Sequence, residues 1–385
     1  MTPAGQPLRH QPSHPDDASA EALLVGAVER VSPSGQERDV VRYLRDAVAP
    51  WADVAEIDAA GNLAARFGAG PRRVMLLGHV DTAPGAWPVS LQGRRLHGRG
   101  AVDAKGSLCA MLVAASRLSS AQRQRVSVQV VGAVEEEAAS SRGARHALQA
   151  YAAPELVVIG EPSGWDAITL GYKGRLALRV RFERPEGHSA HADASAAVQL
   201  SAAWEQLRRW AAHRSARSSS AFDAVQPTLL EVHSGSDGLR QWAEGVIAFR
   251  LPPDLAPEQA QQSVARILHS APLTASADVQ VFAGEAAHRS ARDGPVQRAL
   301  RSAIRAEGGT PRHLVKTGTS DMNVVAPVWQ VPIVAYGPGD AALDHTPDEA
   351  LDLDEYLRAA RVLQRALSTL AGDAASAPDQ SPERS

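Results

Sequence analysis

The sequence predicts an α/β protein that is interrupted by a second, α+β domain. Short apolar runs typical of buried strands alternate with helical segments, and this alternation indicates a sheet covered by helices on both faces. The middle of the chain follows a different order of elements. The length of 385 residues also exceeds the roughly 250 to 300 residues that one core commonly supports. With 44% hydrophobic and 22% charged residues, the chain can bury a sizeable core.

The first elements expected along the chain are two helices within residues 21–48, separated by the turn-like sequence Ser32-Pro33-Ser34-Gly35. Strands are expected where short apolar runs occur, and a helix is expected over residues 108–118, with Ser107 as its candidate N-cap. The expected strands lie at 74–77, 126–131, 156–159 and 331–335.

The middle segment predicts a β-α-β-β-α-β order, which is the ferredoxin-like arrangement. Its strands are expected at 176–182, 228–232, 246–251 and 279–282, and its helices at 194–210 and 257–269. We therefore expect an inserted domain at 172–287 between two parts of the main domain, 20–171 and 288–372, the second part resuming with a helix over 294–306. A disordered extension at 1–19 and a flexible tail at 373–385 are expected at the ends.

Composition excludes several classes of function. The net charge of -3 gives no general field for binding nucleic acid. The first nineteen residues contain no apolar run that would resemble a signal peptide or a membrane anchor, so we expect a cytoplasmic protein that does not bind membranes. The single cysteine, Cys109, lies among apolar residues and is expected in the core.

Polar residues follow the predicted strands of the main domain, where open α/β sheets place their ligands. A His-x-Asp sequence ends the first strand, a loop rich in glycine spans 98–106, and three successive glutamates end the second strand. The polar residues concerned are His79, Asp81, Asp103, Glu135, Glu136, Glu137, Glu161 and His345.

Each of these signals has a common structural explanation when taken alone. A His-x-Asp sequence is more often a turn, three carboxylates can form a solvated loop, and the glycine loop could bind phosphate although it lacks P-loop spacing. Their coincidence at strand ends favours a dinuclear zinc site, because imidazole and carboxylate suit Zn²⁺ and a bridging aspartate can hold two ions about 3.5–4 Å apart. Three carboxylates and one hydroxide would balance the positive charge of two such ions. One carboxylate of the set would then remain to act as a base.

At these residues the chain resembles the M20 family of metallopeptidases and deacylases, from about residue 21 to 370. The resemblance implies a mixed-sheet, zinc-exopeptidase-like catalytic domain with an inserted lid that often dimerises. It also implies two divalent ions, with zinc expected and cobalt as the alternative. His79 and Glu161 would hold one ion, Glu137 and His345 would hold the other, and Asp103 would bridge them.

The resemblance also implies catalytic roles. Asp81 would orient His79, and Glu136 would be the general base. The chain has Glu135-Glu136-Glu137 where most relatives have Asp-Glu-Glu, so a shift by one residue is the alternative assignment. His188 matches the lid histidine that stabilises the oxyanion, with His191 as its competitor.

Substrate-binding residues are implied as well. Arg250 matches an arginine that binds the substrate carboxylate, and Thr319 and Ser320 beside Lys316 would add hydrogen-bond donors. A solvated arginine, and a turn that caps the next helix, are the alternative interpretations.

Three segments, 160–166, 171–175 and 316–323, look most like those of the amino-group-carrier-protein lysine hydrolases. Those enzymes release lysine or ornithine from the γ-carboxyl of a carrier protein's C-terminal glutamate, in lysine and arginine biosynthesis. The resemblance thus implies a carrier protein as substrate and a homodimer formed through the lid. A basic docking patch for an acidic carrier, or else a solvated helix face, is expected at Arg208, Arg209, His213, Arg214 and Arg217.

The alternative function is a deacylase of the acetylornithine or succinyl-diaminopimelate type, which acts on a small substrate. Two further classes are a metal-binding module without turnover and a phosphate-binding enzyme. The complete ligand set together with Glu136 argues against the former, and the latter predicts nucleotide affinity without dependence on a transition metal.

Overall fold

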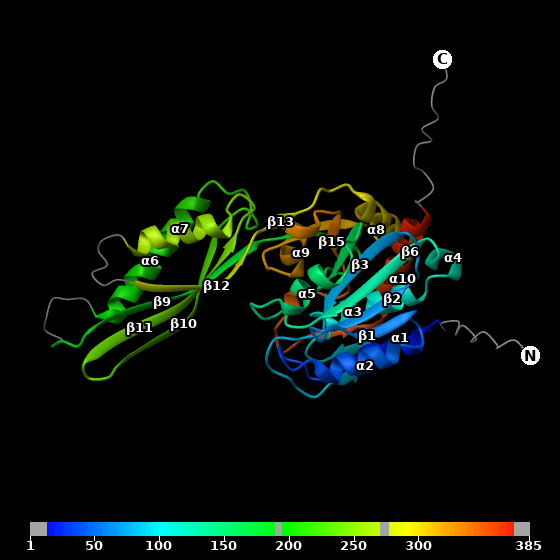
Figure 1. Ribbon diagram of the computed structural model, residues 1–385, viewed down its shortest axis with the longest axis horizontal. Coiled ribbons are helices and arrows are strands. Elements are labelled where there is room, and N and C mark those ends of the chain that lie inside the picture. The colour runs from blue at the N-terminus through cyan, green and yellow to red at the C-terminus, as the bar shows by residue number, and fades with distance from the viewer. Residues whose placement is uncertain (1–13, 189–194, 270–276, 373–385) are drawn as a thin grey trace, which may run out of the picture. The chain divides into compact units, whose positions relative to one another are not determined.

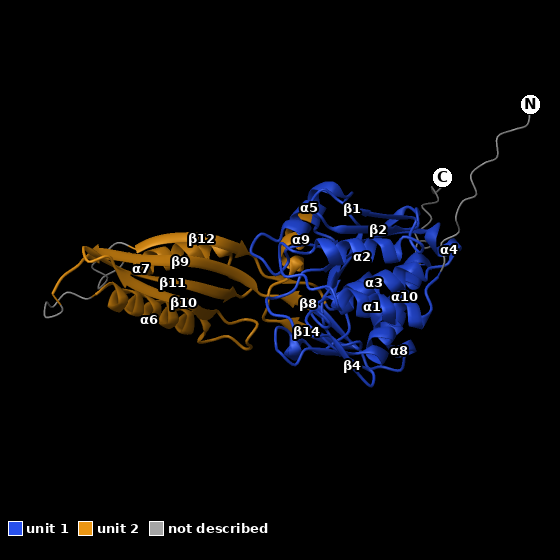
Figure 2. Cartoon of the chain, turned by 90° about the horizontal axis from the view of Figure 1, so that it is seen from below, with its two compact units in different colours: residues 1–169, 292–313, 329–385 blue, residues 170–291, 314–328 orange. Residues whose placement is uncertain are grey.

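The computed structural model describes residues 14–188, 195–269 and 277–372, and the chain divides into two compact units (Figures 1 and 2). Unit 1 comprises Met1–Thr169, Arg292–His313 and Trp329–Ser385. Unit 2 comprises Leu170–Ala291 and Leu314–Val328. Residues 314–328 group with unit 2, although the expected boundaries assign them to the main domain. Residues 1–13 and 373–385, expected to be disordered or flexible, lie outside the described part of the chain.

A mixed sheet forms the core of unit 1, with the strand order β1-β2-β6-β3-β7-β15-β8. The four central strands β6, β3, β7 and β15 are parallel, whereas β2 and β8 join them antiparallel. The strands are β1 (Val54–Ile57), β2 (Leu63–Phe67), β3 (Arg72–His79), β6 (Val126–Ala133), β7 (Leu156–Gly160), β8 (Ala167–Tyr172) and β15 (Ile333–Ala335).

Both faces of this sheet are covered. Every residue of β7 is buried, and since successive residues of a strand point to opposite faces, continuous burial requires cover on each side. Helix α3 packs against β3, β6 and β7 and α8 against β7 and β15, both beside α10, while α2 packs against β1 and β2 and α5 against β6. The helical elements of unit 1 are α1 (Asp17–Val28), α2 (Arg38–Val48), α3 (Lys105–Ser116), α4 (Ser120–Arg123), α5 (Arg142–Ala150), α8 (Pro295–Ala306), α10 (Leu353–Gly372) and the 3-10 helix η1 (Ala341–Leu343). The predicted α/β class is confirmed.

The start of α3 differs from the prediction. The helix begins at Lys105 after Ala104, and Ser107 lies inside its first turn rather than at the N-cap. The Asp103 loop sets this start, because the Lys105 N–H donates to Gly100 O and the Leu108 N–H donates to Ala104 O. Further along α3, Cys109 is fully buried as predicted, and burial raises the pKa of its thiol to about 12.

A second, three-stranded sheet in unit 1 was not predicted. Its order is β16-β5-β4, with β4 (Ser90–Gln92), β5 (Arg95–His97) and β16 (Ala350–Asp352) all antiparallel. Because β5 leads into the glycine-rich loop and β16 follows the segment of His345, this sheet joins the stems of two loops that are distant in sequence.

Unit 2 contains the predicted β-α-β-β-α-β order, and its sheet β10-β11-β9-β12 is antiparallel throughout. Its elements are β9 (Gly174–Pro185), α6 (Ala196–Ser215), β10 (Gln226–Ser236), β11 (Arg240–Leu251), α7 (Pro257–Leu268) and β12 (Ala277–Glu285), followed by β13 (His288–Arg289), β14 (Arg312–Lys316) and α9 (Asp321–Trp329). Leu178, Phe182, Ile247 and Phe249 belong to one buried cluster with residues of α6 and α7. The two helices therefore cover one face of this ferredoxin-like sheet (Figure 1).

Among the described residues, no helix has both the length and the apolar character needed to cross a membrane.

Candidate metal centre

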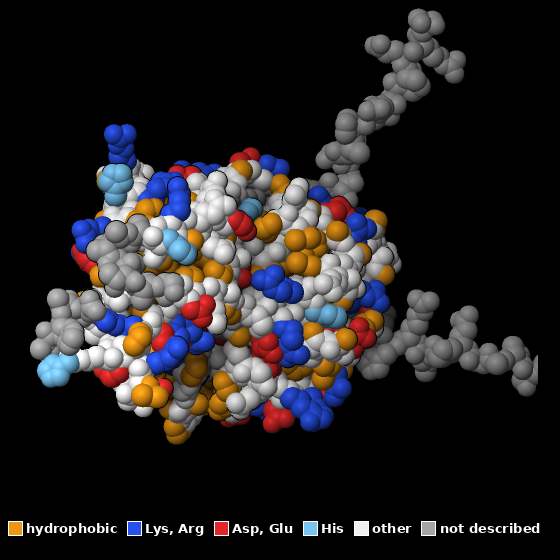
Figure 3. Space-filling model, turned by 60° about the vertical axis from the view of Figure 1, so that its left-hand side comes forward, with side chains coloured by type: hydrophobic (Ala, Val, Ile, Leu, Met, Phe, Trp, Pro, Cys, Tyr) orange, Lys and Arg blue, Asp and Glu red, His pale blue; other side chains and the backbone are white. Residues whose placement is uncertain are grey.

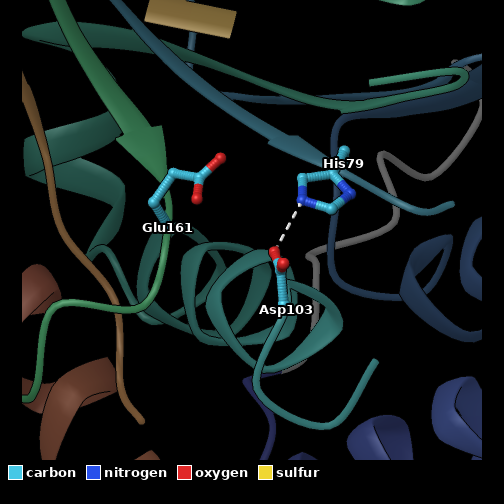
Figure 4. A group of neighbouring side chains, drawn as sticks. All are labelled: His79, Asp103 and Glu161. Atoms are coloured by element: carbon cyan, nitrogen blue, oxygen red, sulfur yellow. Dashed lines mark hydrogen bonds and ion pairs between the residues drawn. The ribbon is translucent and has the colours of Figure 1, made fainter. Parts of the chain in front are cut away.

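Three buried side chains of unit 1 meet at the ends of two neighbouring parallel strands (Figure 4). His79 is the last residue of β3, and Glu161 follows β7 directly. The register pairs Gly78 with Gly160, so His79 and Glu161 leave the sheet side by side. Asp103, from the loop before α3, completes a group whose possible ligand atoms all lie within 4.8 Å of one another.

A second group consists of Asp103, Glu137 and His345, again with possible ligand atoms within 4.8 Å. His345 Nε2 lies 2.9 Å from Glu137 Oε1 and 3.0 Å from Asp103 Oδ2. The other oxygen of Asp103, Oδ1, lies 3.2 Å from His79 Nε2. Asp103 thus presents one oxygen to each histidine and is shared by both groups. The structure brings together all five predicted metal ligands.

The chemistry of these side chains fits two divalent cations. His79 Nδ1 lies 2.9 Å from the backbone carbonyl of Asp81, and since a carbonyl can only accept, Nδ1 carries a proton. The other ring nitrogen, Nε2, faces Asp103 and would hold a cation in place of its own proton. Burial opposes ionisation of Asp103, but hydrogen bonds from His345 and His79 outweigh it and lower its pKa. Hydrogen bonds to Asp103 and Glu137 raise the pKa of His345 to about 10. The carboxylates therefore favour positive charge at both positions.

Asp81 belongs to neither ligand group but contacts residues of both. Its fully buried carboxylate accepts hydrogen bonds from the Glu136 and Glu137 N–H groups, both at 3.0 Å, and from Ser34 Oγ at 2.7 Å. It also lies 3.5 Å from His79 Nδ1. Burial works against the charged form of Asp81, but hydrogen bonds from His79 and Ser34 are among the contacts that lower its pKa. The Asp81 carboxylate thus contacts both the His79 ring and the backbone of the glutamate loop.

The three glutamates are directed to different partners. Glu135 accepts a hydrogen bond from Ser140 Oγ at 2.6 Å and pairs with Arg142 Nε at 2.7 Å. Glu137 belongs to the second ligand group. Glu136 lies between them, and its charge is one of those that raise the pKa of His79 against the effect of burial. This arrangement favours Glu136 and Glu137 over the assignment shifted by one residue.

A buried ion pair that the sequence does not predict lies beside the centre. Glu349 is fully buried, and its Oε1 accepts the N–H groups of Val102 at 3.0 Å and Asp103 at 3.1 Å. Its Oε2 accepts a hydrogen bond from Arg99 Nη1 at 2.9 Å. The only signal in the sequence is a glutamate four residues after His345, directly before the apolar Ala350 and Leu351.

Two of the predicted substrate-binding residues are in contact within unit 2. Arg250 lies on β11, and its Nη1 donates to Thr319 Oγ1 at 2.5 Å. Thr319 Oγ1 in turn donates to Lys173 O at 3.3 Å. Lys316 Nζ lies 5.9 Å from the centre of the Tyr172 ring.

Ser320 and His188 are the other two described candidates in unit 2. Ser320 is buried and its Oγ accepts the Met322 N–H at 3.2 Å, which is the helix-capping alternative at the start of α9. His188 is exposed on the loop after β9 and belongs to neither ligand group. His191 lies outside the described residues.

Comparison with known proteins agrees with this geometry. The model of peptidase family M20/M25/M40 matches residues 75–369. The LysW-lysine hydrolase of Deinococcus radiodurans is 48% identical over 362 residues, which cover 93% of this chain and 99% of that protein. A putative LysW-lysine/LysW-ornithine hydrolase of Thermococcus kodakarensis is 35% identical and covers 93% of this chain and 94% of its own. The M20 family metallo-carboxypeptidase Sso-CP2 from Sulfolobus solfataricus shares the fold, with a TM-score of 0.75 at 18% identity over 91% of this chain and 99% of that chain.

Proposed function

The chain belongs to peptidase family M20/M25/M40, and we propose that it is a two-metal hydrolase that releases lysine, or ornithine, from the γ-carboxyl of a carrier protein's C-terminal glutamate. The 48% identity to a LysW-lysine hydrolase over nearly the full length of both chains supports this substrate. The two ligand groups that share Asp103 support a centre with two ions.

In this proposal His79 and Glu161 hold one ion, Glu137 and His345 hold the other, and Asp103 contacts both. Zinc is the ion that we propose, because nitrogen and oxygen ligands from histidine and carboxylates suit it, and cobalt is the alternative. When bound, two such cations lower the pKa of a shared water and polarise the scissile carbonyl.

Glu136 is the proposed general base. Its carboxylate takes a proton from the attacking water and then gives this proton to the nitrogen of the leaving amine. The side chain is therefore ionised again after the amide bond has broken. The Asp81 carboxylate holds the Glu136 backbone through a 3.0 Å hydrogen bond and so limits where that base can lie.

Residues of unit 2 are proposed to bind the substrate. Arg250 would bind the carboxylate of the departing amino acid through two parallel N–H bonds, and Thr319, Ser320 and Lys316 would add donors. We assign stabilisation of the oxyanion to His188.

The proposed docking surface for the carrier is the basic patch in and just after α6, which nearby acidic residues partly neutralise. Arg208 and Arg209 both pair with Glu205, and Arg214 pairs with Asp254, so much of the patch charge is offset locally. In the face shown in Figure 3, acidic and basic side chains are interspersed.

We also propose that the chain forms a homodimer through unit 2. Two large apolar side chains of β10 are more than half exposed, Leu230 at 58% and Val232 at 56%. Covering them in a second copy would remove apolar surface from water. Sedimentation analysis of the wild type and of a Leu230→Glu/Val232→Glu variant tests this, and a wild-type monomer would refute the dimer.

The function is tested by measuring amine release from a carrier-linked γ-glutamyl lysine, in parallel with N-acetyl-ornithine and succinyl-diaminopimelate. We expect selective release of lysine that a chelator abolishes. Release from a small acyl substrate alone would agree with a hydrolase but contradict the carrier substrate. The chain would then be the alternative, a small-molecule deacylase. Turnover that is insensitive to chelation would refute the two-metal mechanism.

A further inference from the structure

Two loops that supply metal ligands are joined by the buried carboxylate of Glu349. One loop carries Asp103, whose N–H donates to Glu349 Oε1, and the neighbouring Val102 N–H donates to the same oxygen. The other loop carries His345, four residues before Glu349 in the chain. Glu349 therefore holds the backbone of the shared ligand through two N–H groups.

Arg99 connects Glu349 to the backbone of His345. Its Nη1 donates to Glu349 Oε2 at 2.9 Å, and its Nη2 donates to the backbone carbonyl of His345 at 3.3 Å. Only 10% of the Arg99 side chain is exposed. A planar guanidinium with fixed donor directions can bond to two such acceptors at once, which a lysine cannot reproduce.

The backbone at His345 needs such support. His345 has φ 62, a left-handed conformation that costs energy for a residue other than glycine. The three-stranded sheet holds the stems of both loops, because Ala350 pairs with His97 and the Gly98 N–H donates to Glu349 O at 3.2 Å. The tips that carry Asp103 and His345 are linked to each other by the Arg99–Glu349 pair.

We propose that Arg99 and Glu349 are positioning residues that fix His345 relative to Asp103 and so determine how tightly the ion between them is held. His79 and Glu161 depend on this pair far less, because strands β3 and β7 of the main sheet place them. The inference rests on the proposed two-ion centre and assigns a separate support to each half of it.

The test measures binding of each Zn²⁺ ion to Glu349→Gln and Arg99→Lys by titration against a competing chelator, with metal content determined by mass spectrometry. We expect one of the two ions to bind about 10–100-fold more weakly, as is typical when an outer hydrogen-bond partner of a ligand is lost. The other ion should keep its wild-type affinity, because the amide oxygen of a glutamine can still accept the Val102 and Asp103 N–H groups, so that only the link through Arg99 to His345 is lost. Glu307→Gln is the matched control, because Glu307 is a well-buried carboxylate paired with two arginines, Arg361 and Arg365.

The site of the effect is identified in a His345→Ala background, where the ion of His79 and Glu161 remains. Adding Glu349→Gln there should leave the remaining affinity unchanged. Equal weakening of both ions, or a second Glu349→Gln effect in that background, would overturn the assignment. So would two ions of wild-type affinity in both variants. If Glu349→Gln does not fold, as judged by circular dichroism of the metal-free protein, the metal affinity of Arg99→Lys alone tests the proposal.

This experiment reads metal affinity and not turnover. A wild type that binds two ions but ignores the carrier substrate would contradict the proposed function and leave the positioning role intact. Full turnover on the carrier substrate, with unaltered metal affinity in both variants, would contradict the positioning role and leave the proposed function intact.

Discussion

At the scale of single residues, the environment of Glu136 separates it from its two neighbours. Glu135 pairs with Arg142, and Glu137 contacts His345. We predict that Glu136→Gln lowers kcat by about 10²–10⁴-fold, because an amide of the same shape cannot accept the proton of the water. Metal content should stay at the wild-type value, since Glu136 belongs to neither ligand group. Steady-state kinetics and metal analysis measure the two quantities.

The matched control for this variant is Glu135→Gln, which removes the same charge one residue earlier and should retain most of the turnover. Wild-type turnover in Glu136→Gln, or loss of turnover in Glu135→Gln alone, would show that the base has been assigned to the wrong glutamate.

Asp81 is predicted to act on the metal ions through the backbone. In Asp81→Asn only one oxygen remains as an acceptor, while Glu136 N–H and Glu137 N–H each require one. We expect metal affinity to fall about 10–100-fold. Titration with Zn²⁺ measures it, with Asp166→Asn as a control, because Asp166 forms an ion pair with the exposed Arg312. Equal affinity in Asp81→Asn and the wild type would contradict this role.

The sequence predicts the side chains that the structure brings together in the two ligand groups, and Asp81 beside them, but not the contacts of Glu349 and Arg99. His79 ends one buried strand and Glu161 directly follows another, and these residue types at these positions indicate metal chemistry. Glu349 and Arg99 act on backbone groups, and which backbone groups they reach depends on the path of two loops. That path is fixed by pairing between residues about 250 positions apart, such as Ala350 with His97, and no local pattern encodes such pairing.

At the scale of secondary structure, burial decides which elements could be predicted. Strands β3, β6 and β7 are mostly or wholly buried and therefore appear as apolar runs. Strand β4 is exposed at every residue, and β5 has one buried residue, so neither has an apolar pattern to detect. The error at Ser107 has a related cause, because a buried serine inside a helix resembles an N-cap when only its apolar neighbours are considered.

Helix α3 provides a prediction about stability. Ser107 is fully buried, and among the described residues its Oγ has no hydrogen-bond partner, which is unfavourable by about 1–3 kcal/mol. We expect Ser107→Ala to raise the free energy of unfolding by about 1 kcal/mol, helped by the better helix propensity of alanine. Urea denaturation followed by circular dichroism measures the change.

The same helix offers the matched control. Ser116 is also fully buried, but its Oγ donates to Val113 O at 2.7 Å, so Ser116→Ala should not stabilise the protein. A loss of stability in Ser107→Ala would mean that its hydroxyl has a partner, for example a buried water.

At the scale of the whole molecule, unit 2 has the properties of an independent domain. Its buried cluster runs from Leu176 to Leu268 without a residue of unit 1, and its four long strands pair only with one another. We predict that a fragment of residues 172–287, the inserted domain expected from the sequence, folds alone and unfolds cooperatively. Its free energy of unfolding should be near the lower end of the range of about 5–15 kcal/mol that is typical of domains.

Urea unfolding of this fragment can be followed by tryptophan fluorescence, because Trp210 packs edge-on against Phe249 with ring centres 5.7 Å apart. Phe249→Ala should cost about 3–5 kcal/mol, since Phe249 is fully buried, and should bring the fragment close to its unfolding midpoint in water. A broad, non-cooperative transition in the unsubstituted fragment would show that its core depends on the rest of the chain. A sharp transition that Phe249→Ala weakens would show that the apolar pattern of residues 172–287 is sufficient to specify this fold.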